Sequence, residues 1–184
     1  MKHHICPWYM GYILASPLRR LYQNPETIVF PYCKPGMRVL EIGPGMGFFS
    51  LPMAEKIGSS GKIYCVDVQE KMLRTLRRKV LQRKLDYRVE LRRCSEASLE
   101  VHDLNGTIDF ALAFAVVHEV PDPDFLLDEI AVSLRPGGIL LIAEPRGHVD
   151  ETGFAELIRR AETHGFRNTA SPDIRGSHAA LLKH

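Results

Sequence analysis

The chain has 184 residues, of which 45% are hydrophobic and 25% are charged, as in ordinary folded globular domains. This length suits one domain with a single core. The formal net charge at pH 7 is only +2, so overall charge gives no reason to expect a nucleic-acid partner. The four cysteines form no C-x-x-C pair. Because Cys65 and Cys94 fall on predicted strands, we expect buried, reduced thiols.

The first residues form a mostly apolar run that imitates a secretory signal peptide. Lys2 precedes residues 5–15, but this run is too short to cross a bilayer, and its proline and aromatic residues are atypical of a signal core. No other segment is long and apolar enough to span a membrane. We therefore expect a cytoplasmic protein that is not inserted in a membrane.

Residues 1–35 precede the alternating strands and helices and are not needed to complete a sheet. Their aromatic side chains can exclude water and present hydroxyl groups to a ligand. We expect this segment to fold over the binding site as a lid or cap, although the same residues could simply cover apolar surface at a sheet edge. The aromatic residues are Trp8, Tyr9, Tyr12 and Tyr22, and we predict that the first three contact the substrate.

From residue 36 onward, apolar runs typical of strands alternate with stretches of helical periodicity. Asp122 and Asp150 stand just before two of the helices as N-terminal signals. The predicted strands are 38–42, 62–67, 88–94, 108–115, 138–144, 166–171 and 177–183. The predicted helices are 48–57, 70–84, 124–135 and 151–164.

The alternation predicts an α/β fold with a doubly wound, mostly parallel sheet of seven strands and helices on both faces. The last two strands are joined by about six residues, which is too few for a parallel crossover, so they should form an antiparallel hairpin at the C-terminal edge. We predict one domain over residues 1–184, with its core at 36–184.

The most informative segment is 39–48, Val-Leu-Glu-Ile-Gly-Pro-Gly-Met-Gly-Phe, in which a buried strand turns through three glycines into a helix. Glycines let a ligand approach the backbone because no Cβ blocks it. The next strand ends in Asp67, whose carboxylate suits the two hydroxyls of a ribose. The unit predicts a nucleoside-bearing cofactor across the strand ends.

The glycine spacing separates two classes of cofactor. The dinucleotide fingerprint G-x-G-x-x-G has a third glycine where this chain has Phe48. Glu41, just before the loop, is a poor neighbour for phosphates and a better one for the ammonium and sulfonium groups of S-adenosylmethionine. The loop therefore favours S-adenosylmethionine over a dinucleotide.

At this motif the chain resembles the class I S-adenosylmethionine-dependent methyltransferases, most of all the small type 11 group, whose E/D-x-G-x-G-x-G motif is matched by residues 41–47. Residues 116–122 are similar to that family's V-L-H-H-V-x-D loop, and residues 134–138 to its L-K-P-G-G turn. Each match is short, but together they follow the family's order over nearly the whole chain. The resemblance implies a Rossmann-like sheet and methyl transfer.

The resemblance also implies a cofactor site at the carboxyl ends of the first, second and fourth strands. Residues after the third strand usually bind the adenine amino group in this family, although Glu96 could equally begin a solvated loop. Glu41 either faces the cationic end of the cofactor or hydrogen-bonds the amides of the loop. The predicted cofactor-binding residues are Glu41, Gly43, Gly45, Gly47, Asp67, Val68, Ser95, Glu96 and Phe114.

One polar residue follows the fourth strand and two flank the end of the fifth, and we predict that all three face the same crevice. His118 is the first candidate for a catalytic base, because histidine can take a proton near neutral pH, and Glu144 and His148 are the reserves. Loop capping would explain these residues equally well. The segment 118–121 breaks any H-E-x-x-H pattern, and we predict no metal.

Arginines and lysines are concentrated between residues 71 and 93, where they could attract RNA phosphates. Helix 70–84, however, has an apolar face, so its arginines should lie on the opposite, solvent-exposed face. A basic run on a helix usually forms such a solvated face. We therefore do not expect nucleic acid as a partner. The predicted apolar face comprises Met72, Leu73, Leu76, Val80 and Leu81.

The leading hypothesis is an enzyme that transfers the sulfonium methyl group to a small-molecule acceptor by in-line displacement, with the protein supplying alignment and water exclusion. An RNA methyltransferase and a non-catalytic S-adenosylmethionine-binding partner module are the alternatives. Strongly salt-dependent RNA binding would favour the first alternative, and a lack of turnover the second. The sequence makes no prediction of the acceptor's identity or of the oligomeric state.

Overall fold

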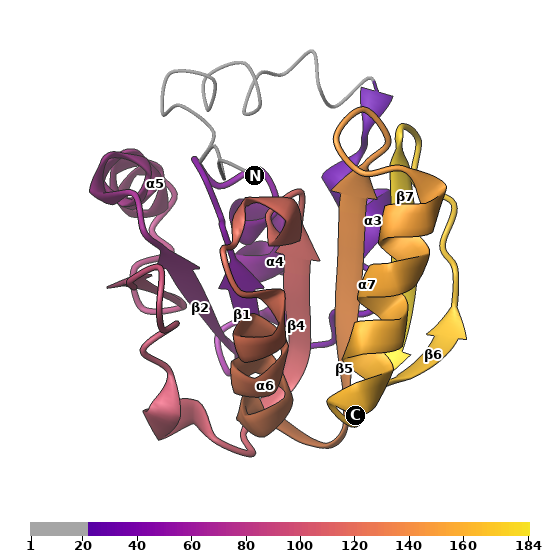
Figure 1. Ribbon diagram of the computed structural model, residues 1–184. Coiled ribbons are helices and arrows are strands. Elements are labelled where there is room, and N and C mark those ends of the chain that lie inside the picture. Colours follow the sequence, from indigo (N-terminus) through magenta and orange to yellow (C-terminus); the bar gives the residue numbers. More distant parts are fainter. Residues whose placement is uncertain (1–21) are drawn as a thin grey trace.

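A computed structural model describes residues 22–184, which form a seven-stranded sheet with helices on both faces (Figure 1). The spatial order of the strands is β3-β2-β1-β4-β5-β7-β6. The β5–β7 and β6–β7 pairs are antiparallel and the others are parallel, so the predicted fold is confirmed. The strands are β1 (Arg38–Ile42), β2 (Lys62–Asp67), β3 (Val89–Arg93), β4 (Ile108–Phe114), β5 (Leu134–Pro145), β6 (Arg167–Ala170) and β7 (Ser177–Lys183).

The helices cover the two faces of the sheet as separate layers. On one face lie α3 (Pro25–Val29), α4 (Ser50–Ile57) and α5 (Glu70–Gln82). On the other face lie α6 (Pro123–Ser133) and α7 (Glu151–Thr163), in front of the sheet in Figure 1. The short 3-10 turns η1 (His102–Leu104) and η2 (Val117–Glu119) flank β4.

The strand order reverses between β1 and β4. From β1 the chain winds outward through β2 to β3, and it then returns to place β4 on the other side of β1. Connections on either side of this switch point diverge, so a crevice opens at the carboxyl ends of the two strands. Central strands are covered by helices on both faces, and the last four residues of β1 are accordingly buried.

Helix α5 buries Met72, Leu73, Leu76 and Val80, which recur every three or four residues along one side. The prediction that Leu81 belongs to this buried face is wrong, because its side chain is 56% exposed. Consecutive residues of a helix are rotated by about 100°, which takes Leu81 from the edge of the buried stripe into solvent.

Other differences from the predicted elements are local. Helix α3 was not predicted; Asn24 caps it, and Val29 and Cys33 are buried in the core against α4. Strand β5 begins at residue 134 because Leu134 pairs with Ile108 before a shift of register. Cys65 is buried as predicted, whereas Cys94 follows β3 and is only partly buried.

The part of the 1–35 segment that the structure describes thus contributes to the core. Tyr22 stacks on Arg175, whose guanidinium carbon lies 4.4 Å from the ring centroid, in the loop between β6 and β7. Within residues 22–184, no helix is long and apolar enough to cross a membrane.

Candidate functional site

A pocket lies at the carboxyl ends of β1, β2 and β4, and the loop between β1 and α4 forms part of its wall. Gly43 and Gly45 have φ of +65° and +54°, which side chains oppose. A Cβ on Gly43 would lie 2.8 Å from a methyl group of Val116, whereas one on Gly45 would meet no described atom within 4 Å. The backbone at Gly45 is therefore open to a ligand.

Gly47 serves a different purpose from the first two glycines. Its φ is +88°, and a Cβ there would lie 2.5 Å from Cδ1 of Leu76 on α5. Gly47 is absent from the described pocket wall, and its lack of a Cβ lets the loop pack closely against α5. The contact of Gly47 with the cofactor stays a prediction.

Asp67 ends β2 and is 7% exposed in the pocket wall. Its Oδ1 accepts a hydrogen bond from the backbone N–H of Gln69 at 2.8 Å. Burial raises the pKa of Asp67 to about 6, although hydrogen bonds from the Gln69 and Gly45 amides act to lower it. A carboxylate has about four acceptor positions, so Asp67 keeps capacity for the hydroxyls of a ligand.

Four more of the predicted residues line the pocket. Ser95 and Glu96 follow β3, Val68 follows β2, and Phe114 ends β4. The loop after β3 is tied to α6 because Glu129 accepts hydrogen bonds from Ser98 Oγ and the backbone N–H of Leu99, at 2.8 and 2.6 Å.

Glu41 does not reach the pocket. It is 2% exposed, and its Oε2 accepts a hydrogen bond from the Cys65 thiol, 3.6 Å away on β2. Burial raises the pKa of Glu41 to about 7, although the hydrogen bond from Cys65 acts to lower it. Glu41 therefore lies in the core on the α4 and α5 side of the sheet, behind the glycine loop. Its predicted role toward the cationic end of the cofactor stays a prediction.

The loop after β4 and α6 contribute a part of the pocket wall that was not predicted from the sequence. An N-cap signal marked Asp122, but which side of α6 faces the crevice depends on how that helix crosses the sheet. Phe48 and Phe49, which follow Gly47, were predicted to be part of a helix and not of the pocket wall. Unpredicted residues of the pocket wall include Phe48, Phe49, Met72, Glu119, Asp122, Phe125, Leu126 and Glu129.

The described wall of the pocket is acidic. It includes five carboxylate side chains and, among residues 22–184, no lysine, arginine or histidine. Such a wall attracts a positively charged ligand and repels phosphates. The five carboxylates belong to Asp67, Glu96, Glu119, Asp122 and Glu129.

Beside the pocket, the ends of β4 and β5 bring the three candidate bases together. Glu144 is fully buried and accepts a hydrogen bond from the backbone N–H of Val117 at 2.8 Å. His118 Nδ1 is in contact with Glu144 Oε2, and the His148 ring centroid lies 5.0 Å from that of His118. None of the three lines the pocket, although Glu119, next to His118, does.

The partner of His118 fixes its tautomer. Glu144 Oε1 accepts hydrogen bonds from the backbone N–H groups of Val116 and Val117, which turns Oε2 toward His118. A carboxylate oxygen facing Nδ1 favours the tautomer with its proton on Nδ1, which leaves Nε2 of the neutral ring as an acceptor. Burial alone would lower the pKa of His118, but the hydrogen bond and charge of Glu144, together with the charge of Glu119, outweigh it and raise that pKa. The predicted substrate contacts Trp8, Tyr9 and Tyr12 lie outside the described residues.

Comparison with known proteins matches residues 33–173 to the model of a family described as "Methyltransferase domain". The chain belongs to this methyltransferase family. Methyltransferases of this class use S-adenosylmethionine, which is therefore the cofactor here. The open backbone at Gly45, the Asp67 carboxylate and the acidic wall all fit this cation, whose sulfonium and ammonium are positive.

This methyltransferase has relatives named ubiquinone/menaquinone biosynthesis C-methyltransferase. The one from Cellvibrio japonicus is 29% identical over 161 residues, which are 86% of this chain and 61% of the relative. The one from Teredinibacter turnerae is 29% identical over 73% of this chain and 53% of the relative. The chain thus spans between half and two thirds of the length of these relatives.

Solved structures share the fold of this methyltransferase. A structure described as a SAM-dependent methyltransferase from Aquifex aeolicus superposes with a TM-score of 0.86, covering 97% of this chain and 99% of that chain. Its sequence is 24% identical. The likeness extends over nearly the whole of both chains.

Proposed function

We propose that this protein, acting in the cytoplasm, transfers a methyl group from S-adenosylmethionine to a small organic acceptor. The names of its relatives point to a ring carbon of a quinone precursor as the acceptor atom. The observation that carries the proposal is the placement of the Gly45–Asp67 pocket beside the His118–Glu144 pair, at neighbouring strand ends.

In this proposal the residues of the pocket position the cofactor. Asp67 accepts hydrogen bonds from the ribose hydroxyls, and the backbone at Gly45 lies close to the nucleoside. Ser95 and Glu96 lie near the adenine amino group, and Phe114 lies along the methionine portion. The cofactor supplies a methyl group on a sulfonium, an activated donor that departs as a neutral thioether.

In the His118–Glu144 pair, His118 acts as the base that takes a proton from the acceptor, and Glu144 orients the His118 ring. A hydroxylated ring becomes a better carbon nucleophile when its hydroxyl proton is removed, and His118 Nε2 is the acceptor for that proton. Once the ring carbon has taken the methyl group, its own hydrogen leaves as a proton and the ring oxygen is protonated again, so that one proton is lost overall. Glu144 holds the ring in the correct tautomer and stabilises the imidazolium that forms. His148, next to the His118 ring, is a reserve for the same role.

The test separates cofactor binding from methyl transfer. In calorimetric titration with S-adenosylhomocysteine, Asp67→Asn should weaken binding by about 10–100-fold, as expected for loss of charge-assisted hydrogen bonds. Glu144→Gln should bind the same ligand normally but lose methyl transfer to hydroquinones that lack the ring methyl group, by about 100-fold or more. The reason is that a Gln amide would donate to Nδ1 and move the ring proton to Nε2.

Asp86→Asn, an exposed carboxylate on the turn after α5, serves as the control for binding. No binding of S-adenosylhomocysteine by the wild type would refute the proposal. Normal binding with no transfer to any hydroquinone would instead favour a non-catalytic binding module. Full activity of Glu144→Gln at every pH would remove the pair from the mechanism.

A further inference from the structure

We propose that the outer edge formed by α5 and the turn before β3 docks on an anionic lipid surface. We define this basic edge by Arg77, Arg78, Leu81, Lys84 and Tyr87. It is a surface away from the pocket, and the inference does not depend on the identity of the acceptor.

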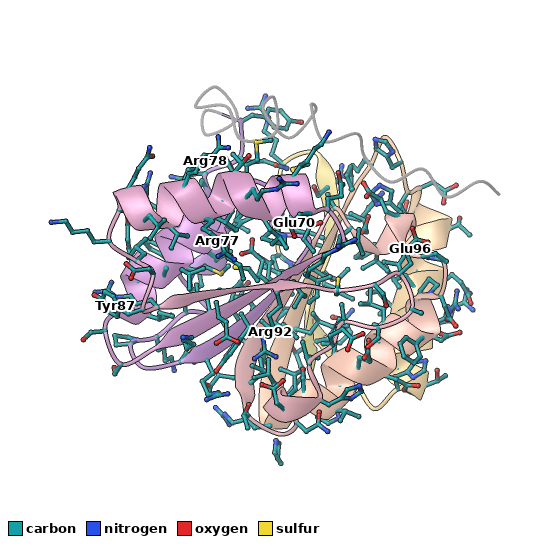
Figure 2. All side chains as sticks on the ribbon, turned by 90° about the vertical axis from the view of Figure 1, so that its left-hand side faces the viewer. Glu70, Arg77, Arg78, Tyr87, Arg92 and Glu96 are labelled. Atoms are coloured by element: carbon teal, nitrogen blue, oxygen red, sulfur yellow. The ribbon has the colours of Figure 1, made fainter. Side chains whose placement is uncertain are left out.

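The charge of the chain is distributed very unevenly. Ten of its 24 lysines and arginines, but only two of its 22 aspartates and glutamates, lie between residues 71 and 93. The remainder of the chain is therefore acidic, although the whole carries a net charge of only +2. Figure 2 faces this side of the molecule, where Arg77 and Arg78 project from α5 and Tyr87 lies beyond the end of the helix.

Several cations of this region are already engaged within the protein. Arg83 pairs with Glu55, Arg74 with Glu70, and Lys79 donates to the backbone carbonyl of Met46. By contrast, the exposed Arg77, Arg78 and Lys84 form no ion pair with another described residue. These three charges are available to an external partner.

Two exposed apolar side chains lie along the same edge: Leu81 on the helix and Tyr87 on the turn after it, where the Tyr87 ring packs against Arg88. Leu81 is 56% exposed and Tyr87 is 54% exposed, and both are among the few large apolar side chains so exposed in the described part of the chain. On the helix, Leu81 stands three and four residues after Arg78 and Arg77, so the three side chains share one surface. Basic side chains around a protruding leucine and tyrosine match the headgroup layer of a membrane, which is charged outside and apolar beneath.

RNA fits this surface less well. An aliphatic side chain such as Leu81 gains nothing from a phosphate backbone, and the pocket wall itself is acidic, so it would repel an RNA substrate at the site of methyl transfer. Arginines beside an edge strand such as β3 can also serve only to prevent strand pairing. That role would not account for the exposed leucine on the helix.

The test uses the full chain and measures co-sedimentation with vesicles of phosphatidylcholine, with and without one third phosphatidylglycerol. Binding is expected only with phosphatidylglycerol, and it should weaken as salt is added. The double variant Arg77→Gln/Arg78→Gln should lower the partition coefficient by about 10–30-fold, because each cation at the surface contributes separately. Leu81→Asn should also lower it, without changing the salt dependence.

The matched control is Arg159→Gln/Arg167→Gln, which removes the same charge from α7 and from β6, the strand at the opposite edge of the sheet. This control should bind vesicles like the wild type, and circular dichroism should show that all variants are folded. Equal losses in both double variants, or unchanged binding by Leu81→Asn, would overturn the proposal. So would an absence of vesicle binding, or tight binding to a single-stranded RNA oligonucleotide in its place.

Discussion

At the scale of single residues, the loop after β1 depends on backbone conformations that side chains oppose. Gly45 and Gly106 have φ of +54° and +65°, and a Cβ on either would meet no described atom within 4 Å. Alanine at each should therefore cost a similar amount of stability, about 1–2 kcal/mol, from the backbone alone. Only Gly45 lines the pocket.

We therefore predict that Gly45→Ala and Gly106→Ala lower the free energy of unfolding alike, whereas only Gly45→Ala weakens the binding of S-adenosylhomocysteine, by about 10-fold or more. Chemical denaturation and calorimetric titration measure the two effects. Equal affinity in both variants would show that the cofactor does not approach the backbone at Gly45.

At the scale of elements, α6 and α7 both begin with an aspartate N-cap, but only the cap of α6 lies at the pocket. Asp122 accepts hydrogen bonds from the backbone N–H groups of Asp124 and Phe125, and Asp150 accepts one from Gly153. Loss of an N-cap costs about 1 kcal/mol, so Asp122→Ala and Asp150→Ala should destabilise the protein similarly.

The two N-caps should differ in their effect on cofactor affinity. The start of α6 forms part of the pocket wall through Asp122 and Phe125, whereas Asp150 is absent from the wall. Asp122→Ala should therefore also weaken S-adenosylhomocysteine binding, while Asp150→Ala should leave it unchanged. Calorimetry on both variants tests this, and an unaltered affinity in Asp122→Ala would mean that the start of α6 plays no part in holding the cofactor.

At the scale of the whole molecule, a buried carboxyl group links global stability to pH. Burial raises the pKa of Glu41 to about 7 from an ordinary value of 4.5, so the folded state holds its proton to higher pH than the unfolded state does. The stabilisation from this proton is fully present below about pH 4.5 and is lost as the pH rises through about 7.

Glu41→Gln removes this titration. The free energy of unfolding of the variant, relative to the wild type, should therefore increase by about 1–3 kcal/mol between roughly pH 5 and pH 8. Denaturant unfolding at the two pH values measures this difference. Glu162→Gln, which alters an exposed carboxylate on α7, should show no such change, and a flat difference for Glu41→Gln would contradict the buried, protonated state.

The sequence by itself determined the order of strands and helices, the antiparallel edge and the class of cofactor. These depend on local patterns: apolar runs, caps, and glycines at fixed spacing before Asp67. Such patterns can be recognised in the sequence because each depends on the conformation of a few adjacent residues. The same locality explains why α3 and the early start of β5 were not predicted, since both depend on contacts with distant segments.

Only the tertiary structure decided which side chains meet. Glu41 and Asp67 both belong to neighbouring parallel strands, yet Glu41 points into the core and Asp67 ends its strand in the pocket wall. Likewise, Glu144 reaches His118 only because β4 and β5 are adjacent, and α6 supplies a wall because of how it crosses the sheet. These relations join residues far apart in the chain, and it is the packing of the core that sets the distances between them.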